Sequence, residues 1–311
     1  RYTTARKEGD LVEILSGVFE GKTTGTPISL MVRNTDQRSR DYGNLAYSYR
    51  PGHADFTFDA KYGFRDYRGG GRSSGRETIG RVAAGAIASR ILETLGISFC
   101  TYTKSIGPVE ITDFDAEEIT RNAFYMPDAS AASAAGAYLE ECMKNQDSAG
   151  GIIECRIKNV PAGLGNPVFE KLDAVLAQAV MSIGAVKAVE IGDGFQVSRM
   201  KGSEDNDGFH TENGQITKTS NHAGGIMGGI SDGSEIVLRA AVKPTPSISQ
   251  PQNTVTKDGS ELSLEIHGRH DPVIVPRAVV VVESMCALAI TDALVSNMTS
   301  RMDSIQKFYQ K

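Results

Sequence analysis

The chain has 311 residues and a formal net charge of −5, with 40% hydrophobic and 23% charged residues. This composition is typical of a globular protein, and the length allows one large domain or two ordinary ones. An acidic pI near 5.6 argues against general nucleic-acid binding, which usually brings a surplus of positive charge.

Hydrophobic patterning and helix start and stop signals predict strands and helices in an irregular order. In chain order these are strands at Leu11–Leu15 and Pro27–Val32, helices at Gly75–Leu95, Ala116–Phe124 and Ala129–Asn145, a strand at Ile152–Lys158, a helix at Pro167–Ser182, a strand at Ile236–Lys243 and a helix at Pro276–Met298. Strands that cluster between helices without regular βαβ alternation favour an α+β fold over a doubly wound sheet. Glycine-rich stretches beside the element ends suit a site assembled from several loops.

Two features bear on the compartment of the protein. The longest apolar run, Ala278–Val295, carries Glu283 and Asp292, so we interpret it as a buried helix rather than a membrane span. The four cysteines form no Cys-x-x-Cys pair, so we expect reduced thiols in a cytoplasmic protein rather than a disulfide framework or a zinc site.

Residues 50–81 form a cationic segment within this acidic chain. The segment contains seven arginine and lysine side chains against four carboxylates. The reversal of sign indicates either a local anion-binding site or an ordinary arginine-rich surface, and composition alone leaves both open. The five histidines of the chain have no metal-ligand spacing, so we expect no metal.

The sequence around Ser74 favours the anion-binding site. Ser74 and Glu77 have the spacing of a capping box at the start of the predicted helix. A helix N-terminus offers free N–H groups and a partial positive charge, which suit phosphate or carboxylate. Arg72 and Arg76 would flank that end, ready for forked hydrogen bonds. Taken alone, a capped helix after a glycine turn is the simpler interpretation.

His53 lies in a Pro-Gly turn ahead of the same loop. A single histidine is more often structural than catalytic. Arg50, however, would favour an anion nearby, and such surroundings suit a proton donor that works near neutral pH. The residues alone leave both roles open.

These motifs resemble those of the chorismate synthase family. The stretches "RPGHAD" and "RGGGRSSGRET" are followed, in the family's order, by "VPAGLGNPVFEKLDA", "VEIGDGF", "SNHAGGIMGGISDG", "KPTPSI" and "GRHDP". The resemblance runs from Arg1 to the C-terminus. It implies a single large α+β catalytic domain over residues 1–311, with helices sandwiched between antiparallel β-sheets. Family members carry about fifty further residues ahead of Arg1, with a Gly-Glu-Ser-His-Gly motif whose histidine is thought to protonate the leaving phosphate.

The resemblance also implies an activity and an assembly. The activity is a carbon–oxygen lyase reaction, the 1,4-anti-elimination of phosphate from 5-enolpyruvylshikimate-3-phosphate to give chorismate, the last shikimate-pathway step toward aromatic amino acids. It requires reduced FMN without net redox change, with NADPH as a candidate reductant. The implied assembly is a cytoplasmic homotetramer with no nucleic-acid or membrane partner.

The functional residues of that family can be placed on this chain one at a time. His53 matches an acid near the reduced flavin, and Asp271 matches a base toward flavin N5. The matched FMN contacts are Arg72, Ser73, Ser74, Gly184, Ala185, Gly228, Lys243, Pro244, Thr245, Pro246, Ser247 and Arg269. The matched substrate or NADP contacts are Arg1, Arg50 and Arg76.

Two rival functions stay open at this point. One is an FMN-dependent NADPH oxidoreductase in which elimination is secondary or absent. The other is a non-enzymatic module that binds anions or nucleic acid through the arginine loop, which the negative net charge disfavours.

Overall fold

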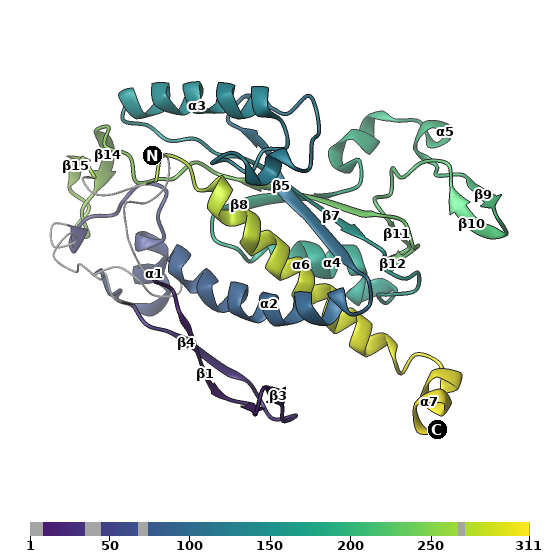
Figure 1. Cartoon of the computed structure of the whole chain (residues 1–311). Helices are drawn as coiled ribbons and strands as arrows, with labels where there is room; N and C mark the ends of the chain where they lie inside the picture. Colours follow the sequence, from purple (N-terminus) through teal and green to yellow (C-terminus); the bar gives the residue numbers. More distant parts are fainter. Residues whose placement is uncertain (1–8, 35–44, 68–73, 267–270, 311) are drawn as a thin grey trace.

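The computed structural model of the chain describes residues 9–34, 45–67, 74–266 and 271–310. Its centre is an antiparallel sheet of five strands in the order β6-β5-β7-β13-β8 (Figure 1). These strands are β5 (Ser98–Ile106), β6 (Val109–Glu110), β7 (Gly151–Lys158), β8 (Val186–Ile191) and β13 (Ile236–Val242).

Apolar alternation decides which face of the sheet is buried. In β7, Ile153, Cys155 and Ile157 are fully buried and lie opposite three fully buried residues of β13. The polar residues between them point to the other face, because successive side chains of a strand alternate. The strands predicted at 152–158 and 236–243 are therefore confirmed to within a residue at each end.

Three helices pack against the buried face in two layers. α6 (Val275–Asn297) contacts β5 and β7, and α4 (Leu172–Met181) contacts β8 and α6. α2 (Thr78–Glu93) rests on α6 and is contacted on another side by β4 (Ser29–Val32) (Figure 1). β4 pairs with β1 (Val12–Ser16) in a two-stranded ribbon, so α2 lies between this ribbon and the layer of α6.

The remaining elements are short or peripheral. The helices are α1 (Asp55–Tyr62), α3 (Ala129–Lys144), α5 (Gly202–Asp205) and α7 (Met302–Tyr309), and 3₁₀ turns occur at Gly75–Glu77, Glu118–Thr120, Val168–Glu170 and Gly194–Arg199. The strands are β2 (Val18–Phe19), β3 (Lys22–Thr23), β9 (Phe209–Glu212), β10 (Gln215–Lys218), β11 (Ile226–Met227), β12 (Ile230–Ser231), β14 (Gln252–Val255) and β15 (Glu261–Leu264). The mixture of helices with antiparallel sheets agrees with the predicted α+β class.

Two predicted helices need correction. The helix expected at 116–124 is only a 3₁₀ turn, because the Asn122 amide donates to the carbonyl oxygens of Glu118 and Met126 and ends the helical ladder. The helix expected at 167–182 is broken at Lys171, whose ψ of 138° is extended, so α4 begins only at Leu172.

α6 is long and apolar enough to cross a membrane by length and composition, the only such helix among the described residues. In this structure it lies on the sheet, with Val282, Cys286 and Ile290 fully buried. It therefore behaves as a core helix, as the sequence predicted.

The contact between α2 and α6 depends on a glycine. A Cβ built on Gly85 would lie 2.3 Å from Cβ and 2.7 Å from Cα of Ser284. The two helix backbones therefore approach each other more closely than any side chain at this position would allow.

We predict that Gly85→Ala lowers the free energy of unfolding by about 2 kcal/mol, because the overpacking cost exceeds the gain in helix propensity. Gly80→Ala is the matched control: Gly80 belongs to the same helix, and its Cβ would meet nothing within 4 Å. That variant should gain up to about 1 kcal/mol. Denaturant unfolding measures both, and equal gains at the two positions would contradict the packing described here.

Candidate functional site

The loop of His53 and the loop of Lys243–Ser247 form the centre of the candidate site. His53 Nε2 lies 2.8 Å from Ser247 Oγ, and Lys243 Nζ donates to the Gly52 carbonyl at 2.7 Å. Gly52 has a φ of +70°, and a Cβ there would lie 2.7 Å from Cβ of Pro246. Two motifs that are far apart in the sequence are thus in direct contact.

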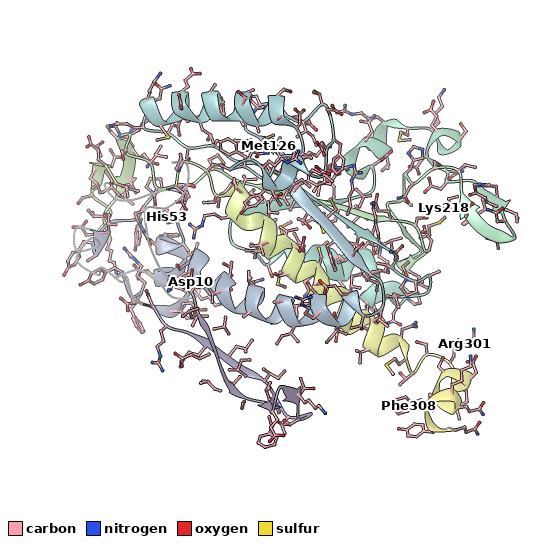
Figure 2. The ribbon with its side chains drawn as sticks, viewed as in Figure 1. Asp10, His53, Met126, Lys218, Arg301 and Phe308 are labelled. Carbon is pink, nitrogen blue, oxygen red and sulfur yellow. The ribbon has the colours of Figure 1, made fainter. Side chains whose placement is uncertain are left out.

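A third loop links this pair to Asp271. The Ser148 hydroxyl donates to the Thr245 carbonyl at 2.7 Å, and the Ala149 amide donates to the Pro272 carbonyl at 2.9 Å. Asp271 therefore lies beside the Lys243–Ser247 loop, just ahead of α6. Figure 2 labels His53 at the end of the molecule where α6 begins.

Buried polar atoms in this cluster lack a partner among the described residues. Asp271 has a side chain only 10% exposed; its Oδ2 pairs with Arg277 Nη1 at 2.5 Å, but its Oδ1 accepts no hydrogen bond from residues 9–34, 45–67, 74–266 or 272–310. Thr245 Oγ1 is also buried without a partner. Because buried polar atoms in proteins are nearly always hydrogen-bonded, two such atoms in adjacent loops indicate a place for a polar ligand.

The start of α2 meets the same cluster through the loop at 182–185. Arg81 donates to Ser182 at its hydroxyl, at 2.5 Å, and at its carbonyl, at 3.1 Å. The Lys243 amide donates to the Ala185 carbonyl at 2.9 Å. Gly184 is exposed between these anchors, and a Cβ there would meet nothing within 4 Å. This loop therefore connects the first turns of α2 with Lys243.

The predicted capping box at Ser74 is only half formed. Ser74 is an N-cap, with its hydroxyl accepting from the Arg76 amide at 3.3 Å, but it caps a 3₁₀ turn that precedes α2. Glu77 does not return to the Ser74 amide; its carboxylate pairs with Arg81 at 2.9 Å. The reciprocal half of the box was therefore a wrong prediction, because a nearby guanidinium competes for Glu77.

The arginines matched to substrate contacts have carboxylate neighbours in this structure. Arg50 forms a fork with Asp55 through two contacts of 2.8 Å, and Arg76 Nη2 lies 4.0 Å from Asp10 Oδ1. The other matched residues of the cationic loops, namely Arg1, Arg72, Ser73 and Arg269, lie outside the described residues.

Gly228 is not brought to the site. It lies in the turn between β11 and β12, and the next residue, Gly229, accepts a hydrogen bond from the amide of Leu172. Leu172 begins α4, whereas Ser182 follows its other end, so the length of this ten-residue helix, about 15 Å, separates Gly228 from the loop at 182–185. Figure 1 shows β11 and β12 at the end of the sheet away from α1.

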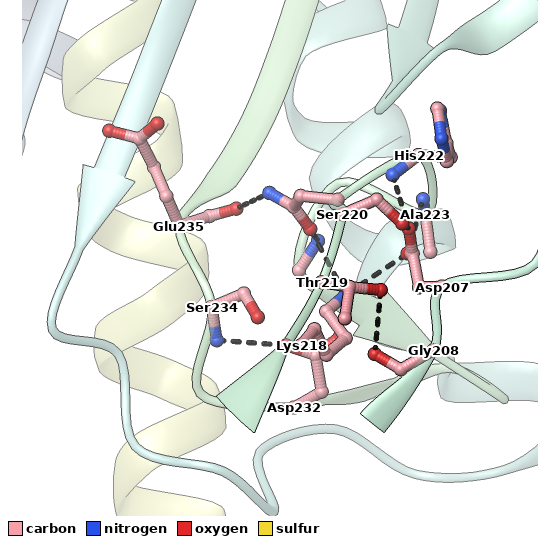
Figure 3. A network of polar contacts seen from close by, with 12 residues as sticks. Asp207, Gly208, Lys218, Thr219, Ser220, His222, Ala223, Asp232, Ser234 and Glu235 are labelled. Atoms are coloured by element: carbon pink, nitrogen blue, oxygen red, sulfur yellow. Dashed lines mark hydrogen bonds and ion pairs between the residues drawn. The ribbon is translucent and has the colours of Figure 1, made fainter. Parts of the chain in front are cut away.

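That opposite end contains a second polar network, shown in Figure 3. Lys218 Nζ donates to Asp207 at 3.2 Å and to Asp232 at 2.7 Å, and all three side chains are at most 9% exposed. Asp207 also accepts from the amides of His222 and Ala223 at 2.8 and 3.1 Å. The network thus fixes the loop of the "SNHAGG" motif.

His222 belongs to this network and not to the His53 cluster. Its Nδ1 lies 2.7 Å from Asp193 Oδ2. The hydrogen bond to the Asp193 carboxylate raises the pKa of His222 above its usual value. A cavity of about 460 Å³ lies beside the pair, lined by Glu190, Asp193, Phe195, Gln196, Ser198 and Arg199.

Sequence reasoning missed three residues that shape the His53 cluster. Asp55 and Arg277 are the partners of Arg50 and Asp271, and Ser148 joins the two loops. The spacing of Arg50 and Asp55 around a Pro-Gly turn was a usable signal, because it lets a carboxylate close the turn. Ser148 carries no local signal, since its partner is distant in sequence.

Known proteins of one family resemble the chain along its length. The family model described as chorismate synthase matches residues 1–295. The chorismate synthases of Agathobacter rectalis and Lachnoclostridium phytofermentans are 62% and 63% identical to it, over the whole of this chain and 85% and 86% of their own lengths. That of Methanocella arvoryzae is 55% identical over 94% of this chain and 80% of its own length. A crystal structure titled chorismate synthase is 33% identical, with a TM-score of 0.74, and covers 97% of this chain and 83% of that one.

We predict that Lys218→Met costs about 3–5 kcal/mol of stability, because it leaves Asp207 and Asp232 buried without their shared cation. Lys171→Met is the matched control, since Lys171 pairs with Asp173 while 44% exposed. It should cost less than about 1 kcal/mol. Denaturant unfolding at neutral pH measures both losses. A similar small loss in the two variants would contradict the role of Lys218 as the shared cation of Asp207 and Asp232.

The same network predicts a pH dependence. Burial alone would raise the pKa of Asp207, but hydrogen bonds from Ser220, from two backbone amides and from Lys218 lower it. Hydrogen bonds from Lys218 likewise lower the pKa of Asp232 against the effect of burial. Their stabilisation is therefore complete above the unfolded pKa of about 3.9 and is lost as the pH falls through the lower folded values.

The difference in unfolding free energy between the wild type and Lys218→Met should accordingly shrink as the pH falls from 7 to 3, because protonation neutralises first the carboxylates that the variant leaves unpaired and then those of the wild type. A difference that stays constant from pH 7 to pH 3 would show that Lys218 stabilises by packing alone.

Proposed function

The chain belongs to the chorismate synthase family, and from this premise we propose that it catalyses the 1,4-anti-elimination of phosphate from 5-enolpyruvylshikimate-3-phosphate to chorismate, with reduced FMN as cofactor and NADPH as a candidate reductant. The observation that carries the proposal is the convergence of His53, the Lys243–Ser247 loop and Asp271 on one cluster that contains unsatisfied buried polar atoms. The rival readings as an NADPH oxidoreductase or an anion-binding module have no comparable support.

The chemistry of the cluster fits a flavin nucleotide. FMN carries a phosphate, hydroxyls and ring nitrogens. The cluster offers an ammonium, hydroxyls and a carboxylate oxygen that receives no hydrogen bond from the part of the chain that the structure describes. The residues that would hold it are Ser74, Gly184, Ala185 and Lys243–Ser247, with Asp271 alongside. When bound, reduced FMN supplies electron density to the breaking C–O bond and recovers it afterwards.

The substrate would be held by cations of this end of the molecule. It carries two carboxylates and a phosphate, roughly four negative charges if the phosphate contributes about two. Arg76 and Lys243 lie on two of the converging loops, and positioned cations stabilise the charge that develops on departing phosphate. Removal of one such group typically costs about 2.7–4 kcal/mol of transition-state stabilisation.

Proton control would belong to His53 and Asp271. The hydrogen bond between His53 Nε2 and Ser247 Oγ holds the imidazole in one orientation, so that its proton is presented in a fixed direction. Asp271 Oδ1 accepts no hydrogen bond from the described residues, and the other oxygen of this carboxylate is held by Arg277. An acid and an acceptor on separate, anchored loops suit two distinct proton transfers.

We also propose one domain and a cytoplasmic homotetramer. A single cluster of buried apolar residues joins the sheet with α2, α3, α4 and α6, which supports one domain. Gly228, the matched FMN contact, is separated from the other matched residues by the length of α4. It would therefore reach a site only on a second copy of the chain, which supports an oligomer.

The function is tested by an anaerobic assay of the purified protein with reduced FMN and 5-enolpyruvylshikimate-3-phosphate. We expect equal amounts of phosphate and chorismate, and no net oxidation of the flavin. Steady NADPH oxidation without phosphate release would instead favour the oxidoreductase and overturn the proposal.

We predict that His53→Ala retains FMN binding but lowers kcat by about 10²-fold or more, the size expected when a general acid is lost. His210→Ala is the control, because His210 is exposed on β9 and its ring hydrogen-bonds only to Thr217 among the described residues. Flavin fluorescence measures binding and phosphate release measures turnover. Normal turnover in His53→Ala would remove His53 from the mechanism.

A further inference from the structure

We propose that Asp55 is a positioning residue for His53: by holding Arg50 in a fork, its carboxylate fixes the turn that carries His53 against the Lys243–Ser247 loop. The inference rests on the proposed function, in which His53 is the acid.

Asp55 accepts three hydrogen bonds from Arg50, two of them from the guanidinium group and one from the backbone amide. Arg50 Nε donates to Asp55 Oδ2 and Nη2 donates to Oδ1, each at 2.8 Å. The Arg50 backbone amide adds a third bond to Oδ2 at 3.1 Å. Asp55 is 8% exposed, and planar bidentate pairs of this kind are strong and geometrically specific.

The fork closes the turn on which His53 sits. Arg50 and Asp55 lie on either side of Pro51–Ala54, and the His53 amide donates to the Arg50 carbonyl at 3.2 Å. Pro51 has its φ restricted by its ring, and Gly52 adopts a φ of +70°. With both ends joined by Asp55, little freedom is left for the His53 backbone.

A second set of contacts fixes Asp55 itself. Asp55 is the first residue of α1, and Asp59 in the next turn pairs with Lys257 at 2.9 Å and with Arg65. Arg65, whose side chain is 4% exposed, also donates to the Ser48 carbonyl at 2.7 Å and lies 3.7 Å from Asp55 Oδ1. The helix that carries Asp55 is thus anchored to the chain on both sides.

The surroundings of Asp55 favour its ionised form. Burial alone would raise the pKa of Asp55, but hydrogen bonds from Arg50 and the charges of Arg50 and Arg65 lower it. The fork therefore persists at neutral pH, and removal of either partner alone leaves a buried charge uncompensated.

The fork therefore restricts the orientation of His53. Its imidazole is held by Ser247, and its turn is held by Lys243 and Pro246 on one side and by the Arg50–Asp55 fork on the other. Without the fork, the turn is anchored on one side only, and the proton of His53 is presented correctly in a smaller fraction of molecules. Loss of orientation lowers kcat while substrate affinity stays nearly unchanged, because Asp55 itself faces Arg50 and Arg65 and not the ligand.

The test compares Asp55→Asn with Asp128→Asn in the protein loaded with reduced FMN. Asp55→Asn should lower kcat by about 10-fold or more, a part of the 10²-fold or larger effect of losing the acid itself, and leave KM within about 2-fold. It should also change the NMR titration of the His53 ring in the absence of substrate. Asp128→Asn alters a comparably buried carboxylate, 5% exposed, that caps α3 and does not contact the His53 turn, so it should lower stability while leaving kcat and the His53 titration unchanged.

A second variant distinguishes the loss of positioning from a general loss of folding. The pair Arg50→Met with Asp55→Leu removes both charges, so that no buried ion is left without a partner. If the two residues act only as a linked unit, this double variant should show the same kcat and KM as Asp55→Asn. A rise in KM on removal of Arg50, with kcat preserved, would show that Arg50 binds the substrate and would overturn the inference.

The proposed function and this inference fail in different ways. Wild-type kcat and an unchanged His53 titration in Asp55→Asn, with His53→Ala remaining slow, would reject the positioning role and leave the acid in place. Wild-type turnover in His53→Ala would reject the acid itself, whatever Asp55 does.

Discussion

The close packing of α2 on α6 is the constraint on which the candidate site depends. α6 lies on the sheet, α2 lies on α6, and Gly85 permits the contact because a side chain there would clash with Ser284. Both helices begin near the same end of the molecule, with Ser74 ahead of one and Asp271 ahead of the other. The loops at 182–185 and 243–247 reach that end from β8 and β13, so the sheet and its two helix layers decide which loops meet.

Buried charge is handled in the same manner at three places in the chain. Asp55, Glu154 and Asp207 are each buried and each held by cations. Burial alone would raise the pKa of Glu154, but a hydrogen bond from Tyr102 and charged neighbours lower it to about 2. Such pairs add little net stability over an apolar core, yet they fix orientation, since a misplaced partner would leave an ion unpaired. In this protein Asp55 fixes the His53 turn, Glu154 fixes polar side chains on the face of the sheet opposite its buried apolar face, and Asp207 fixes the "SNHAGG" loop.

The sequence predicted most of the helices and strands and the loops that form the site. It did not predict which side chains pair with one another within the site. Strands β7 and β13 follow from alternation, because one face of each is buried. The helix expected at 116–124 failed because a side-chain amide, Asn122, took over the hydrogen bonds of the backbone. Periodicity cannot register such competition, since it reports only which residues are apolar.

Arg50 shows the same limit within the site. A family motif marks a position as needed without saying whether its side chain touches the ligand or holds a neighbour that does. Here the contacts separate the two: Arg50 directs three donors to Asp55, whereas His53 directs its ring to the Lys243–Ser247 loop. The fork uses Nε and one N–H of Nη2, and the negative charge of Asp55 offsets part of the positive charge that the guanidinium presents to a ligand. The positive charge of residues 50–81 is therefore not all available to a ligand, because part of it stabilises the turn that carries His53.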